Sequence, residues 1–309
     1  MIEARGLTKK YGDKGAVDNV SFTIAEGKVT GFLGPNGAGK STTMRMMVGL
    51  DRPTSGTVTI NGKSYREHPS PLREVGALLE ARSAHAGRSA ENHLLALAAT
   101  HGIGKARVHE VIAMAGLESV ARKRVGGFSL GMGQRLGIAV ALLGNPKTVV
   151  LDEPVNGLDP DGVRWVRSLL RHLASEGRTV LLSSHLMSEM AQTADHIIVL
   201  GRGKVIADAP VSDILSMTTQ SVRVRSPHAS ELAQLLVGPD VTTKTADDGA
   251  LIVSGLTSEH VGTVAAEGRF VLHELTPLSG SLEDAYLSLT DDQVEYRTGS
   301  EPTNKEYVR

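Results

Sequence analysis

The sequence contains no cysteine, which excludes disulfide bonds and metal sites built from thiolates. Aromatic residues make up only 3% of the 309 residues, so aliphatic side chains and methionine must fill the core. The longest apolar stretches, such as residues 136–143, fall well short of the ~18 residues that a membrane-spanning helix needs. No apolar signal-peptide segment follows Met1. We therefore expect a soluble protein of a reducing, cytoplasmic compartment.

The sequence also lacks an excess of either charge. It has 33 lysines and arginines against 34 aspartates and glutamates, which gives a net charge of -1. Proteins that bind nucleic acid usually carry a basic excess, so no nucleic-acid partner is expected. The length suits one large domain together with a smaller one, or two domains of medium size.

One stretch matches the phosphate-loop pattern G-x-x-x-x-G-K-[ST] at every position: Gly34-Pro35-Asn36-Gly37-Ala38-Gly39-Lys40-Ser41. Glycines let the backbone curl, so that successive N–H groups point at phosphate oxygens. Lys40 can reach the β- and γ-phosphates, and the Ser41 hydroxyl can bind Mg²⁺. Residues 28–33 predict a strand before the loop, and residues 41–48, which include Thr42, predict a helix after it. This context favours a nucleotide site over a glycine-rich turn that matches by chance.

A second candidate site element is the acidic pair Asp152-Glu153, which follows an apolar run at residues 148–151. In phosphate-loop NTPases an acid at the end of such a strand holds Mg²⁺, so Asp152 is the candidate metal ligand. Glu153 is the candidate for orienting and polarising the attacking water. The alternative is a strand that ends in a solvated acidic turn, and the presence of the phosphate loop disfavours it.

Hydrophobic periodicity predicts a parallel α/β core with an antiparallel edge and a helical insertion. Val20, Phe22 and Ile24 alternate with polar residues as in a half-buried strand, and Asn61-Gly62 predicts a β-hairpin. The period is helical over about residues 88–145. Continuous apolar runs then predict strands buried on both faces, at residues 148–151, 179–182 and 196–200.

A domain boundary is expected at residues 216–221, where a polar run interrupts the pattern. Residues 216–290 predict a small α+β domain with the order β-α-β-β-α-β, its last strand at 270–275, and a terminal helix. Its own core is expected to use Leu235, Ile252, Val264 and Leu272. This segment offers no nucleophile or phosphate loop, so we expect it to support assembly rather than catalysis. Residues 291–309 have the composition of a flexible tail.

The segment Phe128-Ser129-Leu130-Gly131-Met132-Gly133-Gln134-Arg135 resembles the signature motif of ABC-transporter ATPases. Other landmarks of that family follow in order. Tyr11 matches the aromatic residue that stacks on adenine, Asp159 lies in a match to the D-loop, and His185 matches the switch histidine that contacts the γ-phosphate. The resemblance covers residues 1–215.

What the resemblance implies is a phosphate-loop NTPase fold of the ABC ATPase type, with an antiparallel β-subdomain and a helical subdomain. It implies ATP and Mg²⁺ as cofactors. It also implies catalysis by Glu153, His185 and Lys40, and contacts of Ser129, Gly131 and Asp159 with nucleotide.

The chain departs from the family pattern at two places. The usual signature is Leu-Ser-Gly-Gly-Gln, whereas this chain keeps Ser129 and Gly131 but carries Leu130 and Met132. Glu80 stands where the metal-contacting glutamine usually lies, and a carboxylate there could reach Mg²⁺ through water. Together with Leu282-Glu283-Asp284-Ala285-Tyr286, these features resemble ATPases of bacterial drug and antibiotic exporters of the daunorubicin-resistance and bacitracin-resistance type.

The resemblance implies an ATP-hydrolysing subunit that powers export of a drug, antibiotic or similar amphipathic compound. Its partners would be a separate multispanning permease, at the inner face of the cell membrane, and a second ATPase that is a copy of itself or a homologue. In this family two ATPase domains meet head to tail, so Ser129 and Gly131 would close over phosphates bound by the other domain. Two alternatives stay open. Soluble ABC-type ATPases that act on ribosomes resemble two fused domains, and DNA-repair or chromosome ATPases carry a long coiled coil where this chain has a compact helical insertion.

Overall fold

The computed structural model describes residues 1–80, 84–216, 221–239, 241–278 and 281–290. The expected polar boundary run at 217–220 and the expected tail at 291–309 lie outside these residues. The chain divides into two compact units, one built on Met1–Asp208 and one on Ala209–Ser288. Each unit has a hydrophobic core of its own. Within the described residues, no helix has both the length and the apolar character needed to cross a lipid bilayer.

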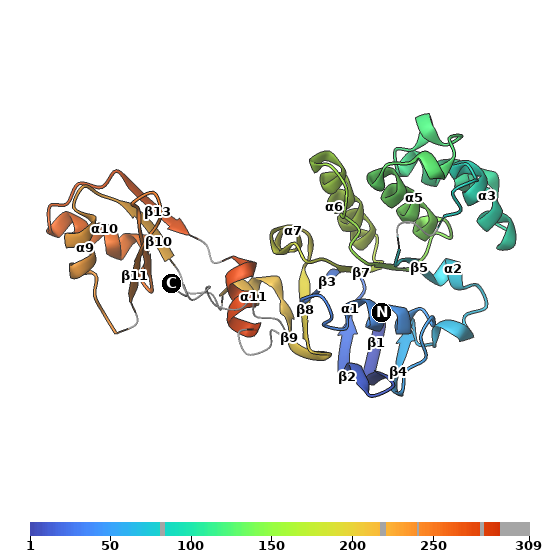
Figure 1. The fold of residues 1–309 in the computed structure, drawn as a ribbon, viewed down its shortest axis with the longest axis horizontal. Coiled ribbons are helices and arrows are strands. Elements are labelled where there is room, and N and C mark those ends of the chain that lie inside the picture. Colours follow the sequence, from blue (N-terminus) through green and yellow to red (C-terminus); the bar gives the residue numbers. More distant parts are fainter. Residues whose placement is uncertain (81–83, 217–220, 240, 279–280, 291–309) are drawn as a thin grey trace, which may run out of the picture. The chain divides into compact units, whose positions relative to one another are not determined.

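The first unit begins with a three-stranded antiparallel sheet of order β2-β1-β4. Its strands are β1 (Ile2–Tyr11), β2 (Lys14–Ile24) and β4 (Ser55–Ile60). The three alternating apolar residues of β2 named above are all buried, as the period predicts. In Figure 1 this sheet lies in the lower part of the first unit, drawn in blue.

The turn expected at Asn61-Gly62 forms, but the second strand of the expected hairpin does not. Both residues do have positive φ angles, 51° and 79°, as the turn chemistry requires. However, β4 pairs with β1, which places Ile60 opposite Ile2, and only an isolated bridge to Lys63 follows the turn. The chain instead enters a short 3₁₀ helix, η1 (Tyr65–Glu67), which a capping box starts.

A six-stranded sheet of order β5-β6-β7-β3-β8-β9 forms the centre of the first unit. Its strands are β3 (Val29–Leu33), β5 (Val75–Leu78), β6 (Thr148–Leu151), β7 (Thr179–Ser183), β8 (His196–Gly201) and β9 (Lys204–Pro210). The five strands from β5 to β8 in this order pair in parallel. Every residue of β3, β6 and β7 is buried, which explains their unbroken apolar runs.

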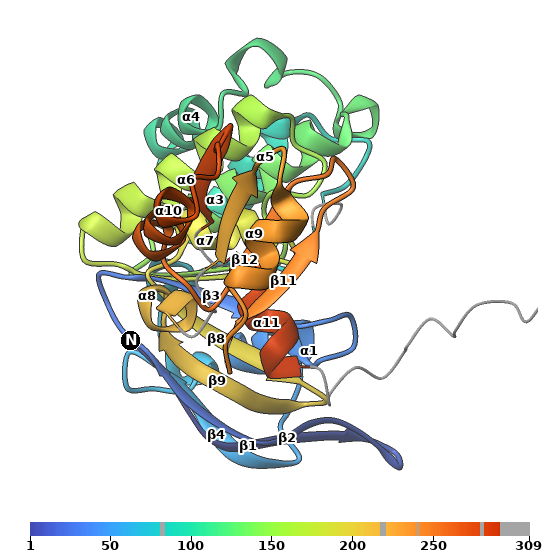
Figure 2. The same ribbon diagram turned by 90° about the vertical axis from the view of Figure 1, so that its left-hand side faces the viewer.

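The first unit also contains helices, some of which pack on this sheet. They are α1 (Lys40–Met47), α2 (Pro71–Glu74), α3 (Ala90–Thr100), α4 (Lys105–Met114), α5 (Leu130–Leu142), α6 (Pro160–Ser175) and α7 (Met187–Thr193), with 3₁₀ turns η2 (Glu118–Val120) and η3 (Val125–Gly127). In Figure 2, α3, α4, α5 and α6 gather on the side of β3 and β8 opposite to the antiparallel sheet. The parallel strands therefore lie between a helical layer and a β layer.

The second unit starts with α8 (Val211–Ser216) and is built around an antiparallel sheet of order β11-β12-β10-β13. Its elements follow as β10 (Ser221–Arg225), α9 (Ala229–Leu235), β11 (Thr242–Thr245), β12 (Leu251–Ser254), α10 (Ser258–Glu267), β13 (Glu274–Leu278) and α11 (Leu282–Thr290).

Two details of this unit differ from the expectation. The last strand begins at Glu274 rather than at residue 270, because Arg269 takes a left-handed conformation after α10 and Phe270 packs against the core before the strand starts. Leu235 is 57% exposed and Ile252 alternates with the buried Leu251 and Val253 on β12, so neither of these two expected residues belongs to the core. Leu232 and Leu236 are buried instead, because they lie on the other side of α9.

Candidate nucleotide and catalytic site

The phosphate loop joins β3 to α1, as the sequence context predicts. Gly37 and Gly39 have φ angles of 83° and 100°, which side chains other than glycine rarely adopt. A Cβ atom on Gly39 would also lie 2.6 Å from the carbonyl oxygen of Ala16. Gly39 is the N-cap of α1 and supplies no side-chain cap, so the first N–H groups of the helix are left for a ligand.

Lys40 is buried, and its Nζ donates hydrogen bonds to the carbonyl oxygens of Gly34 at 2.5 Å and Pro35 at 3.2 Å. Burial lowers the pKa of Lys40, whereas the nearby carboxylates of Glu153 and Asp152 oppose that shift. The ammonium is therefore held against the loop and close to the acidic pair. A cavity of about 370 Å³ opens over this arrangement, and its lining includes the loop, Tyr11, Ser41, Thr42 and both acids.

The acidic pair is fixed by Ser183, at the end of β7. Its hydroxyl donates to Asp152 Oδ1, and it accepts the backbone N–H of Glu153 at 2.9 Å. His185 Nδ1 lies 2.8 Å from Glu153 Oε2. Glu153 has a φ of 49°, an uncommon conformation for a non-glycine residue that is often found at functional sites. The two parallel strands β6 and β7 thus bring two acids and a histidine together at one sheet edge.

Sequence reasoning missed two residues of this cluster, Ser183 and Gln134. The Gln134 side chain donates to the backbone carbonyl of Glu153 at 2.9 Å, which ties helix α5 to the segment that follows strand β6. Ser183 lies two residues before His185, and Gln134 lies inside the signature segment at 128–135. Their closeness to these motifs is the feature of the sequence that could have identified them as site residues.

Oxygen donors suited to a hard cation face this cavity. The Ser41 side chain is exposed, and no hydrogen bond to its hydroxyl occurs among the described residues. One carboxylate oxygen of Asp152 is bound by Ser183, which leaves the other for a ligand. A hydroxyl and a carboxylate that line the same cavity as a phosphate-binding loop are the donor types that Mg²⁺ prefers. The residues present therefore fit the ion that the sequence predicts.

Glu80 lies two residues after β5, and its side chain is exposed. The last residue of β5, Leu78, accepts a hydrogen bond from the backbone N–H of Asp152 at 2.7 Å, so Glu80 follows a strand end next to the acidic pair. Glu80 does not line the cavity over the phosphate loop. Its predicted contact with Mg²⁺, through water, stays a prediction.

We expect Glu80→Gln to retain most of the ATPase activity. An amide can keep a water-mediated contact that a carboxylate makes, because both offer an oxygen acceptor at the same distance along the side chain. Steady-state phosphate release at saturating Mg²⁺ and ATP measures this. A loss as deep as that caused by substituting Glu153 would instead place Glu80 in the chemistry itself.

The signature residues lie on a different surface of the chain. Ser129 is the N-cap of α5, where its hydroxyl accepts the N–H of Met132 at 3.2 Å. Leu130 is 45% exposed and packs against the segment that matches the D-loop, residues 156–159, where a Cβ atom on Gly157 would overlap its side chain. Gly131 also faces Gly157, since an added Cβ would lie 2.9 Å from that carbonyl oxygen.

Asp159 caps helix α6 by accepting the N–H of Gly162 at 2.9 Å. Like Ser129 and Gly131, it does not line the phosphate-loop cavity of its own chain. The structure therefore brings together the phosphate loop, Tyr11, Asp152, Glu153 and His185, but not Ser129, Gly131 and Asp159. If these three residues contact nucleotide as predicted, that nucleotide would have to be bound by a second ATPase chain.

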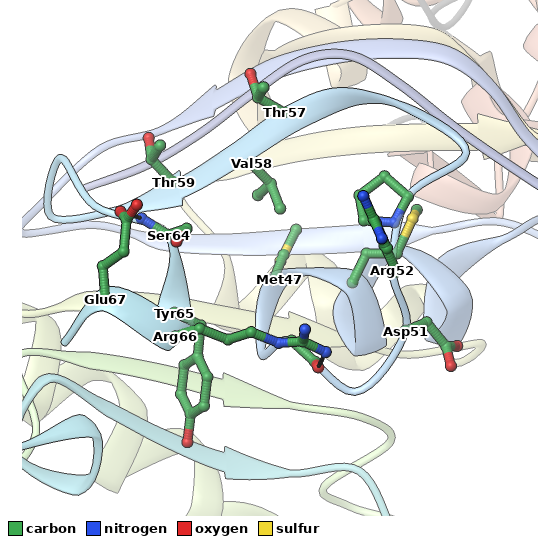
Figure 3. A pocket seen from close by; sticks show the side chains of 13 residues that line it. Met47, Asp51, Arg52, Thr57, Val58, Thr59, Ser64, Tyr65, Arg66 and Glu67 are labelled. Atoms are coloured by element: carbon green, nitrogen blue, oxygen red, sulfur yellow. Dashed lines mark hydrogen bonds between the residues drawn. The ribbon is translucent and has the colours of Figure 1, made fainter.

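A second cavity, of about 470 Å³, lies behind the phosphate-loop helix, between the end of α1, strand β4 and η1. Figure 3 shows Met47 and Val58 pointing toward each other across it. Arg66, from η1, donates to the carbonyl oxygen of Gly49 at 3.0 Å. Asp51 and Arg52, in the loop after α1, border this cavity, which shares no lining residue with the cavity over the phosphate loop.

Comparison with known proteins gives consistent results. Residues 17–156 match the family model described as ABC transporter, and residues 220–283 match a domain family of unknown function. The chain is 39% identical over 303 residues to an uncharacterized ABC transporter ATP-binding protein, YhcH of Bacillus subtilis, which covers 96% of this chain and 97% of that protein. It is 43% identical to the bacitracin transport ATP-binding protein BcrA of Bacillus licheniformis, over 68% of this chain and 70% of that protein.

Among solved structures, the dimeric ATP-binding cassette MJ0796, in a post-hydrolysis state bound to ADP and phosphate, matches with a TM-score of 0.63 and 27% identity. The match covers 68% of this chain and 99% of that one. The structural match, at a sequence identity of 27%, confirms the α/β ABC ATPase fold that the motifs predict.

Proposed function

The chain belongs to the family of ABC transporter ATP-binding proteins, and we propose that it is the ATP-hydrolysing subunit of an exporter for an amphipathic, antibiotic-like compound. ATP binding and hydrolysis follow from the family. The identity of 43% to a bacitracin transport protein is the observation that carries the exporter assignment. The same likeness to transport proteins disfavours the alternatives of a ribosomal or DNA-directed ATPase.

The proposed active form is a head-to-tail dimer, either of two copies or of one copy and a homologous ATPase. Ser129, Gly131 and Asp159 do not line their own phosphate-loop cavity, so in a single chain they have no nucleotide to contact. Across a dimer, the N-terminus of α5 would meet the phosphates of the other subunit with its positive dipole end. A structural neighbour of this chain is dimeric, which supports the arrangement.

In the proposed reaction, a water molecule attacks the γ-phosphorus of ATP, and the bond from that phosphorus to the bridging oxygen breaks to give ADP and phosphate. Glu153 accepts the proton of the water, and His185, hydrogen-bonded to Glu153, faces the γ-phosphate. Lys40 and the N–H groups of the loop hold the phosphate oxygens. Mg²⁺ held by Ser41 and Asp152, with Glu80 through water, would neutralise part of the phosphate charge.

The remaining site residues bind the rest of the nucleotide in this proposal. Tyr11 stacks on the adenine, while Thr42 follows Ser41 in the first turn of α1 beside the phosphates. Because the export path needs a channel, the partner would be a separate multispanning permease. The chain would then act on the cytoplasmic side, bound to the membrane through that permease.

Purification of the tagged chain from cells, followed by identification of bound proteins, tests this function. We expect a membrane protein with several hydrophobic spans to copurify. Deleting the gene should lower resistance to at least one amphipathic antibiotic, and the wild-type gene should restore it, whereas Glu153→Gln should not. Recovery of the chain on ribosomes or DNA, with no membrane partner, would contradict the proposal and favour the alternatives.

A further inference from the structure

The phenol group of Tyr11 is held by a residue that no motif identifies. Its hydroxyl donates a hydrogen bond to Asp51 Oδ2 at 2.8 Å. The same carboxylate accepts two hydrogen bonds from Arg45, from Nε at 2.8 Å and from Nη2 at 3.3 Å. A bidentate guanidinium–carboxylate pair has a fixed geometry, so it fixes where the phenol oxygen sits. Tyr11 itself is 50% exposed and lines the nucleotide cavity.

The carboxylate belongs to the same rigid piece as the phosphate loop. Helix α1 starts at Lys40 and carries Arg45 in its last turn. It ends in a Schellman motif, in which Gly49 has a φ of 70° and the N–H groups of Gly49 and Leu50 return to the carbonyl oxygens of Met46 and Arg45 at 3.1 and 2.9 Å. The Asp51 N–H also reaches the Arg45 carbonyl, at 3.3 Å. The position of Asp51 therefore follows that of the phosphate loop.

The end of β1 is tied to the loop after α1 at further points. Lys9 Nζ donates to the carbonyl oxygen of Arg52 at 2.8 Å and lies 4.8 Å from the centroid of the Tyr11 ring. The N–H of Lys10 donates to Thr54 Oγ1 at 3.0 Å. The ammonium occupies one face of the ring, which leaves the opposite face to receive a planar base.

We propose that Asp51, oriented by Arg45, is a positioning residue that fixes the Tyr11 ring at a set distance from the phosphate loop and so determines affinity for the purine base of the nucleotide. This inference rests on the proposed nucleotide site. It concerns the base alone, because Asp51 lies outside the lining of the phosphate cavity. Figure 3 shows the Asp51 carboxylate at one end of the second cavity, directed away from Thr57 and Val58.

The protonation states agree with this role. The hydrogen bond from Arg45 is the main cause that lowers the pKa of Asp51, and the bond from Tyr11 lowers it further. Burial and then the bond to Asp51 raise the pKa of Tyr11. At neutral pH the pair is therefore an ionised acceptor and a protonated donor, which is the stronger kind of hydrogen bond.

Calorimetric titration with two probes, ATP and inorganic tripolyphosphate, tests the proposal, because tripolyphosphate has the phosphates but no base. The variants are Tyr11→Phe, Asp51→Ala and the double variant. Arg52→Ala is the matched control, since it alters the next residue of the loop but removes no hydrogen bond to Tyr11 or Asp51. Circular dichroism confirms folding, and the conservative Tyr11→Phe keeps the test valid if Asp51→Ala does not fold.

We expect each single variant to lose about three- to tenfold in ATP affinity, with tripolyphosphate affinity unchanged. The double variant should be no weaker than the weaker single one, because both changes remove the same hydrogen bond. Equal losses for both probes would show that Asp51 only supports the loop, and unchanged ATP affinity in Tyr11→Phe and Asp51→Ala would also overturn the inference. Wild-type protein that binds neither probe would contradict the nucleotide site itself, and the inference with it.

Discussion

Glu153→Gln should stop ATP turnover while leaving ATP binding intact. Removing a general base typically costs about 10²- to 10⁴-fold in rate, because an amide cannot accept the proton of the attacking water. The glutamine keeps the size of the side chain and one oxygen acceptor, so the contact with His185 and the backbone bond to Ser183 can persist. We expect phosphate release to fall by that factor and the dissociation constant for ATP to stay within about twofold of wild type.

The stalled protein should also accumulate as an ATP-bound dimer, since nucleotide is needed at the proposed interface and hydrolysis can no longer release it. Size-exclusion chromatography with light scattering, with ATP and with ADP, measures this. Glu80→Gln is the matched control, because it makes the same chemical change two residues beyond the neighbouring strand β5. Turnover equal to that of wild type, or no dimer with ATP, would contradict the role assigned to Glu153.

The phosphate loop and the strands that carry it were predictable, because their signals are local. The loop is one uninterrupted octapeptide, and its glycines are required by backbone angles that the pattern already implies. The runs at β6, β7 and β8 are unbroken because both faces of these strands are buried. The start of helix α6 could be predicted in the same way, since Asp159 caps it and Pro160 follows at its first position.

What the sequence did not predict depends on pairing between distant segments. The Asn61-Gly62 turn is correct as local chemistry, but the strand before it pairs with β1, more than fifty positions earlier in the chain. Leu235 satisfies a helical period in α9, yet the sheet lies against Leu232 and Leu236. The periodicity of a seven-residue helix is too short to distinguish its inner face.

Contacts between segments that are distant in the sequence also explain why some residues of the site were not predicted. Ser183 joins Asp152 and Glu153 from a neighbouring parallel strand, so its role appears only once β6 and β7 are paired. Asp51 reaches Tyr11 across the end of α1, forty positions away, and its residue type alone suggests an ordinary turn. Motifs therefore locate the groups that we propose to contact nucleotide, whereas the residues that orient those groups can be recognised only once the fold is known.

Lys40→Ala should differ from Glu153→Gln by weakening ATP binding as well as turnover. The buried ammonium now donates to the carbonyl oxygens of Gly34 and Pro35 and faces Glu153 and Asp152, so it can transfer to phosphate oxygens without moving far. Charge-assisted contacts to phosphate are the strong kind, and in the alanine variant the acids also lose their nearby cation. We expect the dissociation constant for ATP to rise by about ten- to a hundredfold and hydrolysis to become undetectable.

Calorimetric titration of ATP into Lys40→Ala measures this loss, with Lys204→Ala as the control. Lys204 has an exposed ion pair with Asp18 at 3.4 Å and does not line the phosphate-loop cavity, so its removal should change ATP affinity by less than about twofold. The free variant must show the circular dichroism of the wild type, because a misfolded loop would also lose affinity. ATP affinity that stays at the wild-type value in folded Lys40→Ala would show that the loop N–H groups alone hold the phosphates, and the assignment of Lys40 would then be wrong.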